Sequence, residues 1–187
     1  MKKLNLLFFL FICFIGCSKN ESVIEGRIPD KSYDNEYIYL VPFKNPTKET
    51  VVSTLIRNGS FRFKVNSEKQ NQIYIIRVRP ALRFDLQPIL VIPEQGIVDV
   101  LLDKHSTASG TPLNQILQQW KEEKRISDST YYSILHKYKK GTNESEKVQY
   151  QSELKDISEK YQTYADSLAE VNKDNIIGQF IRSLSKK

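Results

Sequence analysis

The chain has 187 residues, which is enough for one sizeable domain or for a domain with an extension. It carries 28 Lys and Arg against 22 Asp and Glu, a formal net charge of +6, and the basic residues are dispersed along the chain. A mild, dispersed positive charge serves solubility and argues against nucleic acid as a partner.

The N-terminus has the pattern of a secretory leader. Lys2 and Lys3 give it a positive start, and ten unbroken apolar residues follow from Leu6 to Ile15. A membrane-spanning helix needs about 20 such residues. The shorter run is typical of a signal-peptide core, and it predicts a signal peptide over residues 1–16.

The residues around Cys17 resemble a bacterial lipobox. Gly16 is small enough to let a signal peptidase approach, and the Cys17 sulfur would take the diacylglycerol, whereas bulky Ile12 makes Cys13 a poorer candidate. Residues 17–22 would then be a polar tether. Each buried methylene contributes about 0.8 kcal/mol and more than one chain is attached, so an acylated Cys17 would hold the protein stably on the lipid bilayer. The alternative is an ordinary secretory leader with an incidental cysteine.

Residues 23–104 have the pattern of a β-domain. Phe61, Phe63 and Val65 alternate with Arg62 and Lys64, which places one set in a core and the other in water. About seven strands at short intervals predict an antiparallel β-sandwich or a partly open barrel. The expected strands lie near Val23–Pro29, Tyr37–Val41, Glu49–Ile56, Phe61–Val65, Ile73–Val78, Ile89–Ile92 and Ile97–Leu102.

Three glycines mark special backbone positions in this half. Asn58-Gly59 predicts a type I′ hairpin turn. Gly96, after Pro93, predicts a turn that joins the last two expected strands as a second hairpin. Gly26 inside a strand indicates a bulge or a close backbone approach.

Residues 111–185 have helical spacing, after a segment 106–110 of loop composition. Thr111 is suited to the N-cap and Pro112 to the first helical position. Two long helices around a break at residues 141–143 predict an antiparallel hairpin, and a short final helix follows a second break at residues 172–175. The middle of the first helix is polar, so we expect it to weaken or bend near Asp128.

The lengths of these elements predict how they fit together. The first helix would run about 40 Å at 1.5 Å per residue, whereas strands of about six residues run about 20 Å. We therefore expect the hairpin to project beyond the sandwich, with its base near Leu117, Trp120 and Leu168 on the sheet and its tip, Tyr138 to Tyr150, more exposed.

The sequence resembles a family of bacterial lipoproteins. The stretches IPEQGIVDVLLD and SGTPLNQIL, with IEGRI, YIYLV, RNGSFRFKV and NKDNIIGQFI, resemble the DUF4369-type N-terminal β-domain of Bacteroidetes lipoproteins. The resemblance runs from about Val23 to Ile181. In that family the β-domain commonly precedes a thioredoxin-like domain, but this sequence stops at Lys187 and has no thiol after Cys17. The resemblance therefore implies an accessory role beside a thioredoxin-like system, without thiol exchange by this chain.

No residue pattern predicts catalysis. The two histidines, His105 and His136, lack metal-ligand spacing, and neither a Gly-rich phosphate loop nor a Gly-x-Ser-x-Gly elbow is present. We expect no metal, no cofactor and no catalytic residues. Arg77, Arg79 and Arg83 lie close together in sequence. They could form a site for an anion or an acidic glycan, but we favour the interpretation that they are solvated residues of a strand edge and a loop.

The tyrosines leave one alternative open. The chain has 10 of them, and at helix-seam positions a tyrosine buries its ring and leaves its hydroxyl in water. We favour this packing role over stacking on carbohydrate.

The expected function is that of a membrane-anchored lipoprotein of the cell envelope, in the outer membrane and facing the periplasm or the surface. It would serve as a non-catalytic binding module for an envelope protein. The alternatives are a client-binding or dimerising partner of a disulfide reductase system, and a glycan-binding lipoprotein.

The lipid anchor predicts the effect of one substitution. Cys17→Ala removes the sulfur that would be acylated, so the protein should move from the membrane pellet to the soluble fraction on fractionation. A variant that stays membrane-bound and normally processed would contradict lipidation at Cys17.

Overall fold

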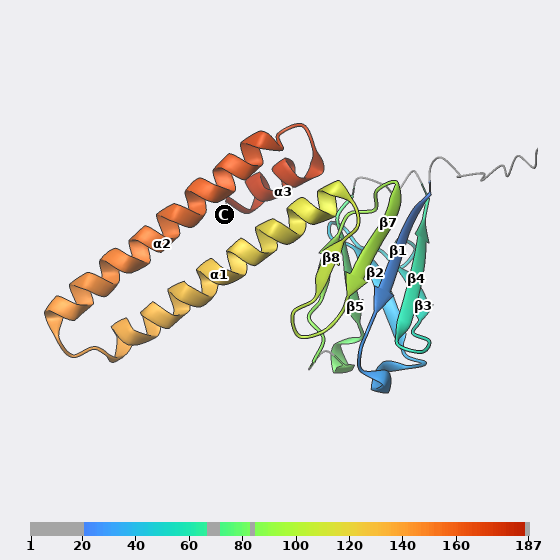
Figure 1. The fold of residues 1–187 in the computed structure, drawn as a ribbon, viewed down its shortest axis with the longest axis horizontal. Coiled ribbons are helices and arrows are strands. Elements are labelled where there is room, and N and C mark those ends of the chain that lie inside the picture. Colours follow the sequence, from blue (N-terminus) through green and yellow to red (C-terminus); the bar gives the residue numbers. More distant parts are fainter. Residues whose placement is uncertain (1–20, 67–71, 83–84, 186–187) are drawn as a thin grey trace, which may run out of the picture.

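The structure is a computed structural model that describes residues 21–66, 72–82 and 85–185, so Cys17 and the expected leader lie outside the described residues. The fold is α+β, as predicted. Two four-stranded sheets pack face to face, and two long helices and a short last helix follow (Figure 1). The two sheets are separate and do not close, so the sandwich is the correct one of the two expected architectures.

The first sheet, sheet A, contains the N-terminal strand at its centre. Its strands in spatial order are β4 (Ser60–Val65), β1 (Ser22–Arg27), β7 (Gly96–Leu101) and β8 (Thr107–Ser109). The β1–β7 ladder is parallel, which the antiparallel prediction missed, and the ladders β1–β4 and β7–β8 are antiparallel. Strand β8 lies where the sequence predicted a loop, so the described strands number eight.

The second sheet, sheet B, is wholly antiparallel. Its strands in spatial order are β3 (Val52–Leu55), β2 (Tyr37–Pro42), β5 (Tyr74–Val78) and β6 (Ile89–Val91). Among the described residues, the 3₁₀ helix η1 (Lys31–Tyr33) lies between β1 of sheet A and β2, and η3 (Pro80–Leu82) lies between β5 and β6.

The type I′ turn at Asn58-Gly59 is confirmed by the antiparallel bridge between Arg57 and Ser60, but neither predicted hairpin continues as a two-stranded ladder. Asn58 and Gly59 have φ of 52° and 68°, as a type I′ turn requires, but β3 and β4 then enter different sheets. The segment around Pro93 likewise carries the chain from β6 in sheet B to β7 in sheet A. Val91 and Val98 are therefore buried in one core that both sheets enclose, instead of lying along a shared ladder.

Gly26 lies under an aromatic ring. It pairs with Phe61 across β1 and β4, and the β1 ladders on both sides keep register through it, so there is no bulge. A Cβ at Gly26 would lie 1.9 Å from Cζ of Phe61. Neither the predicted bulge nor the predicted close backbone approach is present, because the Phe61 ring fills the space that a residue larger than glycine would need.

The helices begin and end close to the predicted breaks. They are α1 (Pro112–Lys140), α2 (Glu144–Val171) and α3 (Ile176–Ser185). Asn143 caps α2 by accepting from the N–H of Ser145. Helix α1 runs unbroken through Asp128, so it is not weakened there as the sequence predicted. Its polar middle is held by an ion pair of 2.7 Å between Lys124 and Asp128, one turn apart.

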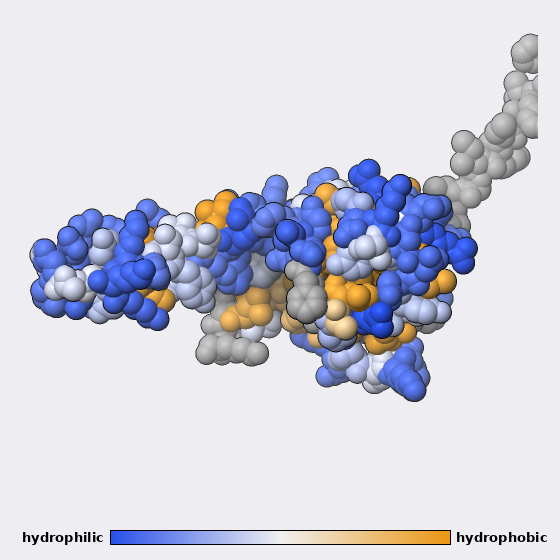
Figure 2. All heavy atoms as spheres, turned by 90° about the horizontal axis from the view of Figure 1, so that it is seen from below, coloured by the Kyte–Doolittle hydropathy of each residue, from blue (hydrophilic) through white to orange (hydrophobic). Residues whose placement is uncertain are grey.

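The helices form an arm that projects from the sandwich, as the lengths predicted (Figure 1). Leu117 and Trp120 are buried at its base, Leu168 packs beside them, and no residue from 121 to 164 is fully buried. Hydrophilic residues cover most of the arm, whereas hydrophobic residues gather over the sandwich and where the arm meets it (Figure 2).

The base of the arm packs on the outer face of sheet B. Ile89 and Val91 point into the sandwich core, so Leu90 and Ile92 point the other way. They form a second apolar cluster with residues of α1, α2 and α3. Within this cluster the Phe180 ring meets the Trp120 ring edge-on at a centroid distance of 5.4 Å, and at its rim it meets the more exposed Phe43 ring at 5.3 Å.

The contact at Gly26 predicts a specific coupling. Gly26→Ala should lower the free energy of unfolding by about 1–3 kcal/mol, because the new methyl group overpacks against Phe61. In the double variant with Phe61→Leu, part of that loss should be recovered relative to Phe61→Leu alone. Urea denaturation of the four proteins measures this, and strictly additive effects would show that the ring and Gly26 do not compete for space.

Candidate functional site

The arm begins on a buried polar cluster. The Asn114 side chain is fully buried and pairs with the backbone of Ile92 in both directions. The Ile92 N–H donates to Asn114 Oδ1 at 2.9 Å, and Asn114 Nδ2 donates to the Ile92 carbonyl at 2.6 Å. Asn114 Nδ2 also donates to Thr111 Oγ1 at 2.7 Å. One amide side chain thus takes the place of a neighbouring strand just beyond β6.

Glu94 caps the same helix from the segment between β6 and β7. The N–H groups of Leu113 and Asn114 donate to Glu94 Oε2 at 2.9 and 3.3 Å. Thr111 and Pro112 hold the predicted N-cap and first helical positions, but Thr111 makes no side-chain cap bond. The capping oxygen comes from Glu94, whose carboxylate also meets the positive end of the helix dipole. We call Ile92, Glu94, Thr111 and Asn114 the junction cluster.

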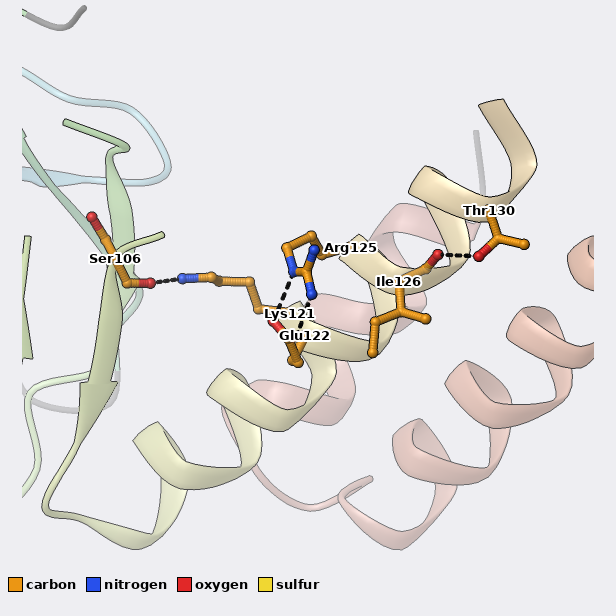
Figure 3. A network of polar contacts seen from close by, with 6 residues as sticks. All are labelled: Ser106, Lys121, Glu122, Arg125, Ile126 and Thr130. Atoms are coloured by element: carbon orange, nitrogen blue, oxygen red, sulfur yellow. Dashed lines mark hydrogen bonds and ion pairs between the residues drawn. The ribbon is translucent and has the colours of Figure 1, made fainter. Parts of the chain in front are cut away.

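Helix α1 then covers the free edge of sheet A. The Ala108 N–H of edge strand β8 donates to Gln118 Oε1 at 3.2 Å. Figure 3 shows Lys121 reaching from α1 to the carbonyl of Ser106, to which its Nζ donates. Burial lowers the pKa of Lys121. Asn114, Gln118 and Lys121 are spaced four and three apart, so one helix face occupies backbone groups at the ends of both sheets and blocks strand addition there.

The outer face of sheet A, by contrast, is open and hollowed. A groove of about 740 Å³ crosses it from β8 to the corner between β3 and β4. The strand register places two rows of side chains in it. The first row is Arg62, Glu25, Asp99 and Ser109, and the second is Ser60, Arg27, Leu101 and Thr107. We call this the sheet A groove, and it is the candidate site.

Three arginines gather around Ser60 at one end of the groove. Ser60 is opposite Arg27 on β1, bridges to Arg57 across the turn, and precedes Arg62 on the same face of β4. Arg62 Nε lies 3.6 Å from Glu25 Oε1, in a pair whose side chains are 56% and 44% exposed. Such an exposed pair contributes at most about 1 kcal/mol, so these arginines remain available to a ligand.

The middle of the groove carries the opposite charge. Glu25 and Asp99 are neighbours on the parallel strands β1 and β7, and both line the groove. Ser109 is opposite Asp99 on β8 and adds a hydroxyl. Chemically, the site offers guanidinium donors at one end, carboxylate acceptors in the middle and hydroxyl groups at the far side.

Two of the three arginines singled out in the sequence lie within the described residues and have separate neighbours. Arg79 pairs with Glu36 at 2.9 Å, Arg77 lies next to Tyr39 on sheet B, and Arg83 is outside the described residues. His105 and His136 are both exposed. Among the described residues no three His, Cys, Asp or Glu side chains are grouped to hold a metal ion.

Sequence reasoning missed Arg27, Arg57 and Arg62 as a group. Alternation within β4 places Arg62 on the solvent side, but only the strand register brings Arg27 and Arg57 to the same corner. Arg57 beside the Asn58-Gly59 turn was the available signal. To recognise the group from the sequence, one would have to know that β1 (Ser22–Arg27) pairs with β4 (Ser60–Val65).

The junction cluster predicts a sharp difference between adjacent positions on α1. Asn114→Ala leaves the N–H and carbonyl of Ile92 without their partner, so it should lower the free energy of unfolding by about 3 kcal/mol. Exposed Gln115→Ala is the matched control and should change it by less than about 0.5 kcal/mol. Equal effects of the two variants in chemical denaturation would contradict the structural role of Asn114.

Comparison with known proteins places the chain in a family. In the described part of the chain, no helix combines the length and hydropathy needed to cross a membrane. No curated protein and no solved structure matches the chain. A domain of unknown function, DUF4369, matches residues 22–117, which is about half of the chain and ends before the stretch around Ile181 where the motif resemblance ended. The match includes the sandwich, the junction cluster and the first turns of α1, and the chain belongs to the DUF4369 family.

Proposed function

We propose that this protein is a lipid-anchored protein of the cell envelope that acts as a non-catalytic binding module for another envelope protein. The leader and the lipobox-like residues before Cys17 support the anchor. The fold supports the binding role, because it presents two distinct surfaces, the arm and the sheet A groove, on one framework.

The observation that carries this proposal is the junction cluster at the base of a projecting arm. Buried hydrogen bonds fix the first turn of α1 to the end of β6, and the second apolar cluster holds α2 and α3 against sheet B. The direction of the arm is therefore set before any partner arrives. A preorganised surface loses less conformational entropy on association than a mobile one, which favours binding to a partner.

The arm itself is suited to recognition. Tyr132 and Val148 are 66% and 60% exposed near its outer part. They lie on a pair of helices that reaches away from the sandwich (Figure 1). Exposed aromatic and aliphatic side chains on a rigid helix face are typical anchors for a protein partner.

One observation favours glycan binding as a second candidate. Tyr37 and Tyr39 lie on the outer face of sheet B with ring centroids 6.5 Å apart, and Tyr37 is 52% exposed. Arg77 is opposite Tyr39 on β5. Neighbouring rings beside a guanidinium offer apolar faces for a sugar ring and donors for its hydroxyl groups.

Cross-linking in the native membrane tests the binding role. A photoreactive amino acid would replace Tyr132 on the arm, Leu101 in the groove or, as a control, Lys31 in η1. The proposal predicts one discrete protein adduct from Tyr132 or Leu101, identifiable by mass spectrometry as an envelope protein, and none from Lys31. If no position gives a protein adduct while the protein is retained on saccharides and Tyr37→Ala abolishes that retention, glycan binding is the function.

A further inference from the structure

The sheet A groove separates charges of opposite sign across the strands. Arg27, Arg57 and Arg62 lie at the corner of β1, β3 and β4, and Asp99 lies on β7. Two strand spacings of about 4.8 Å separate Arg62 on β4 from Asp99 on β7, whereas Arg27 is on β1, one spacing from β7 and two residues from Glu25, so opposite charges lie about 7–10 Å apart. A ligand that matches this groove must carry both signs of charge at that separation.

The arginine corner is not neutralised by the protein itself. Arg62 has Glu25 as its partner, but within the described residues neither Arg27 nor Arg57 forms an ion pair or a side-chain hydrogen bond. Both side chains are exposed and line the groove. Two neighbouring guanidinium groups with free donors favour a carboxylate, which each can bind in bidentate geometry.

The dimensions of the groove match an extended chain. It crosses four strands, which is about 14 Å at the normal strand spacing, and an extended polypeptide covers that distance with about four to five residues. A volume of about 740 Å³ is within the range of a site for such a segment.

The charge pattern selects among the possible ligands. A uniform polyanion would be attracted by the arginines but repelled by Glu25 and Asp99. A uniform polycation would be repelled by the arginines. An extended polypeptide can place an acidic and a basic side chain on the same face two or four residues apart, at about 7 or 13 Å. On the arm side, Asn114, Gln118 and Lys121 already occupy backbone groups of the sheet ends, which leaves the open face of sheet A for the partner.

We propose that the sheet A groove binds an extended segment of the partner polypeptide, with an acidic residue at Arg27 and Arg57 and a basic residue two or four positions away, on the same face, at Glu25 and Asp99. This assignment rests on the proposed binding function and identifies its surface and the chemistry of its partner. Thr107 and Ser109 supply hydroxyl groups at the far side of the same groove.

A labelled peptide tests the groove directly. The probe is a fluorescein-labelled hexapeptide with two glutamates, two threonines and two lysines in that order, added to the purified full-length protein in detergent. Fluorescence anisotropy should show binding that weakens with added salt. The double variant Arg27→Gln with Arg57→Gln should weaken it about tenfold, which corresponds to 1.4 kcal/mol.

Two further variants show which charges matter. Asp99→Asn should weaken binding of the same peptide about threefold, because a single exposed charge pair contributes little to affinity. The matched control, Lys139→Gln with Lys140→Gln, removes two exposed positive charges from the end of α1 and should leave the affinity unchanged. Circular dichroism checks that each variant is folded, and the salt dependence of the wild-type protein is a readout that needs no variant.

Three results would overturn the inference. If hexaglutamate binds as tightly as the mixed peptide, the groove is a polyanion site. If the arm variant weakens binding as much as the groove variant, the contact is non-specific. If the mixed peptide does not bind at millimolar concentration, the groove assignment fails, while the proposed function is judged separately by the cross-link from Tyr132.

Discussion

The double hydrogen bond between the Asn114 side chain and the Ile92 backbone is the constraint on which the rest of the structure depends. It joins the end of a β-strand to the first turn of a helix, and Glu94 adds the missing cap from the same connecting segment. Because these groups are buried, losing one partner leaves others unsatisfied, so the junction has one favoured geometry. The family match ends at Leu117, one turn beyond Asn114. The junction therefore belongs to the family domain, and the outer arm extends from it.

The junction also divides the surface of the protein. On the arm side, side chains from one face of α1 occupy backbone groups of β8 and of the segment after β6. The base of the arm covers part of the outer face of sheet B through Leu90 and Ile92. The outer face of sheet A stays open and carries the charged groove. A partner that uses this face does not compete with the contacts that hold the arm.

Local patterns in the sequence predicted local structure well, and long-range pairing was beyond them. Alternation identified β4, Asn58-Gly59 identified a type I′ turn, and Thr111-Pro112 located the start of α1. Each of these features is decided by neighbouring residues. The predicted ladders beyond the two turns were wrong because short apolar runs beside a turn are equally compatible with one ladder or with two facing sheets. Val91 and Val98 are both buried in the core between the sheets. Strand β8 is only three residues long, and its pairing with β7 and the contact of Gln118 with Ala108 define it. The arginine corner depends on the β1–β4 register, which no single-strand pattern contains.

The central claim is that the junction cluster holds the arm and the sandwich as one rigid body. Spin labels on unnatural amino acids at Lys139 on the arm and Ser53 on sheet B would report their separation by double electron–electron resonance. A rigid junction gives one narrow distance distribution in the wild-type protein and a broad one after Asn114→Ala. A broad distribution already present in the wild-type protein would contradict the claim, because the arm would then move relative to the sandwich despite the junction cluster.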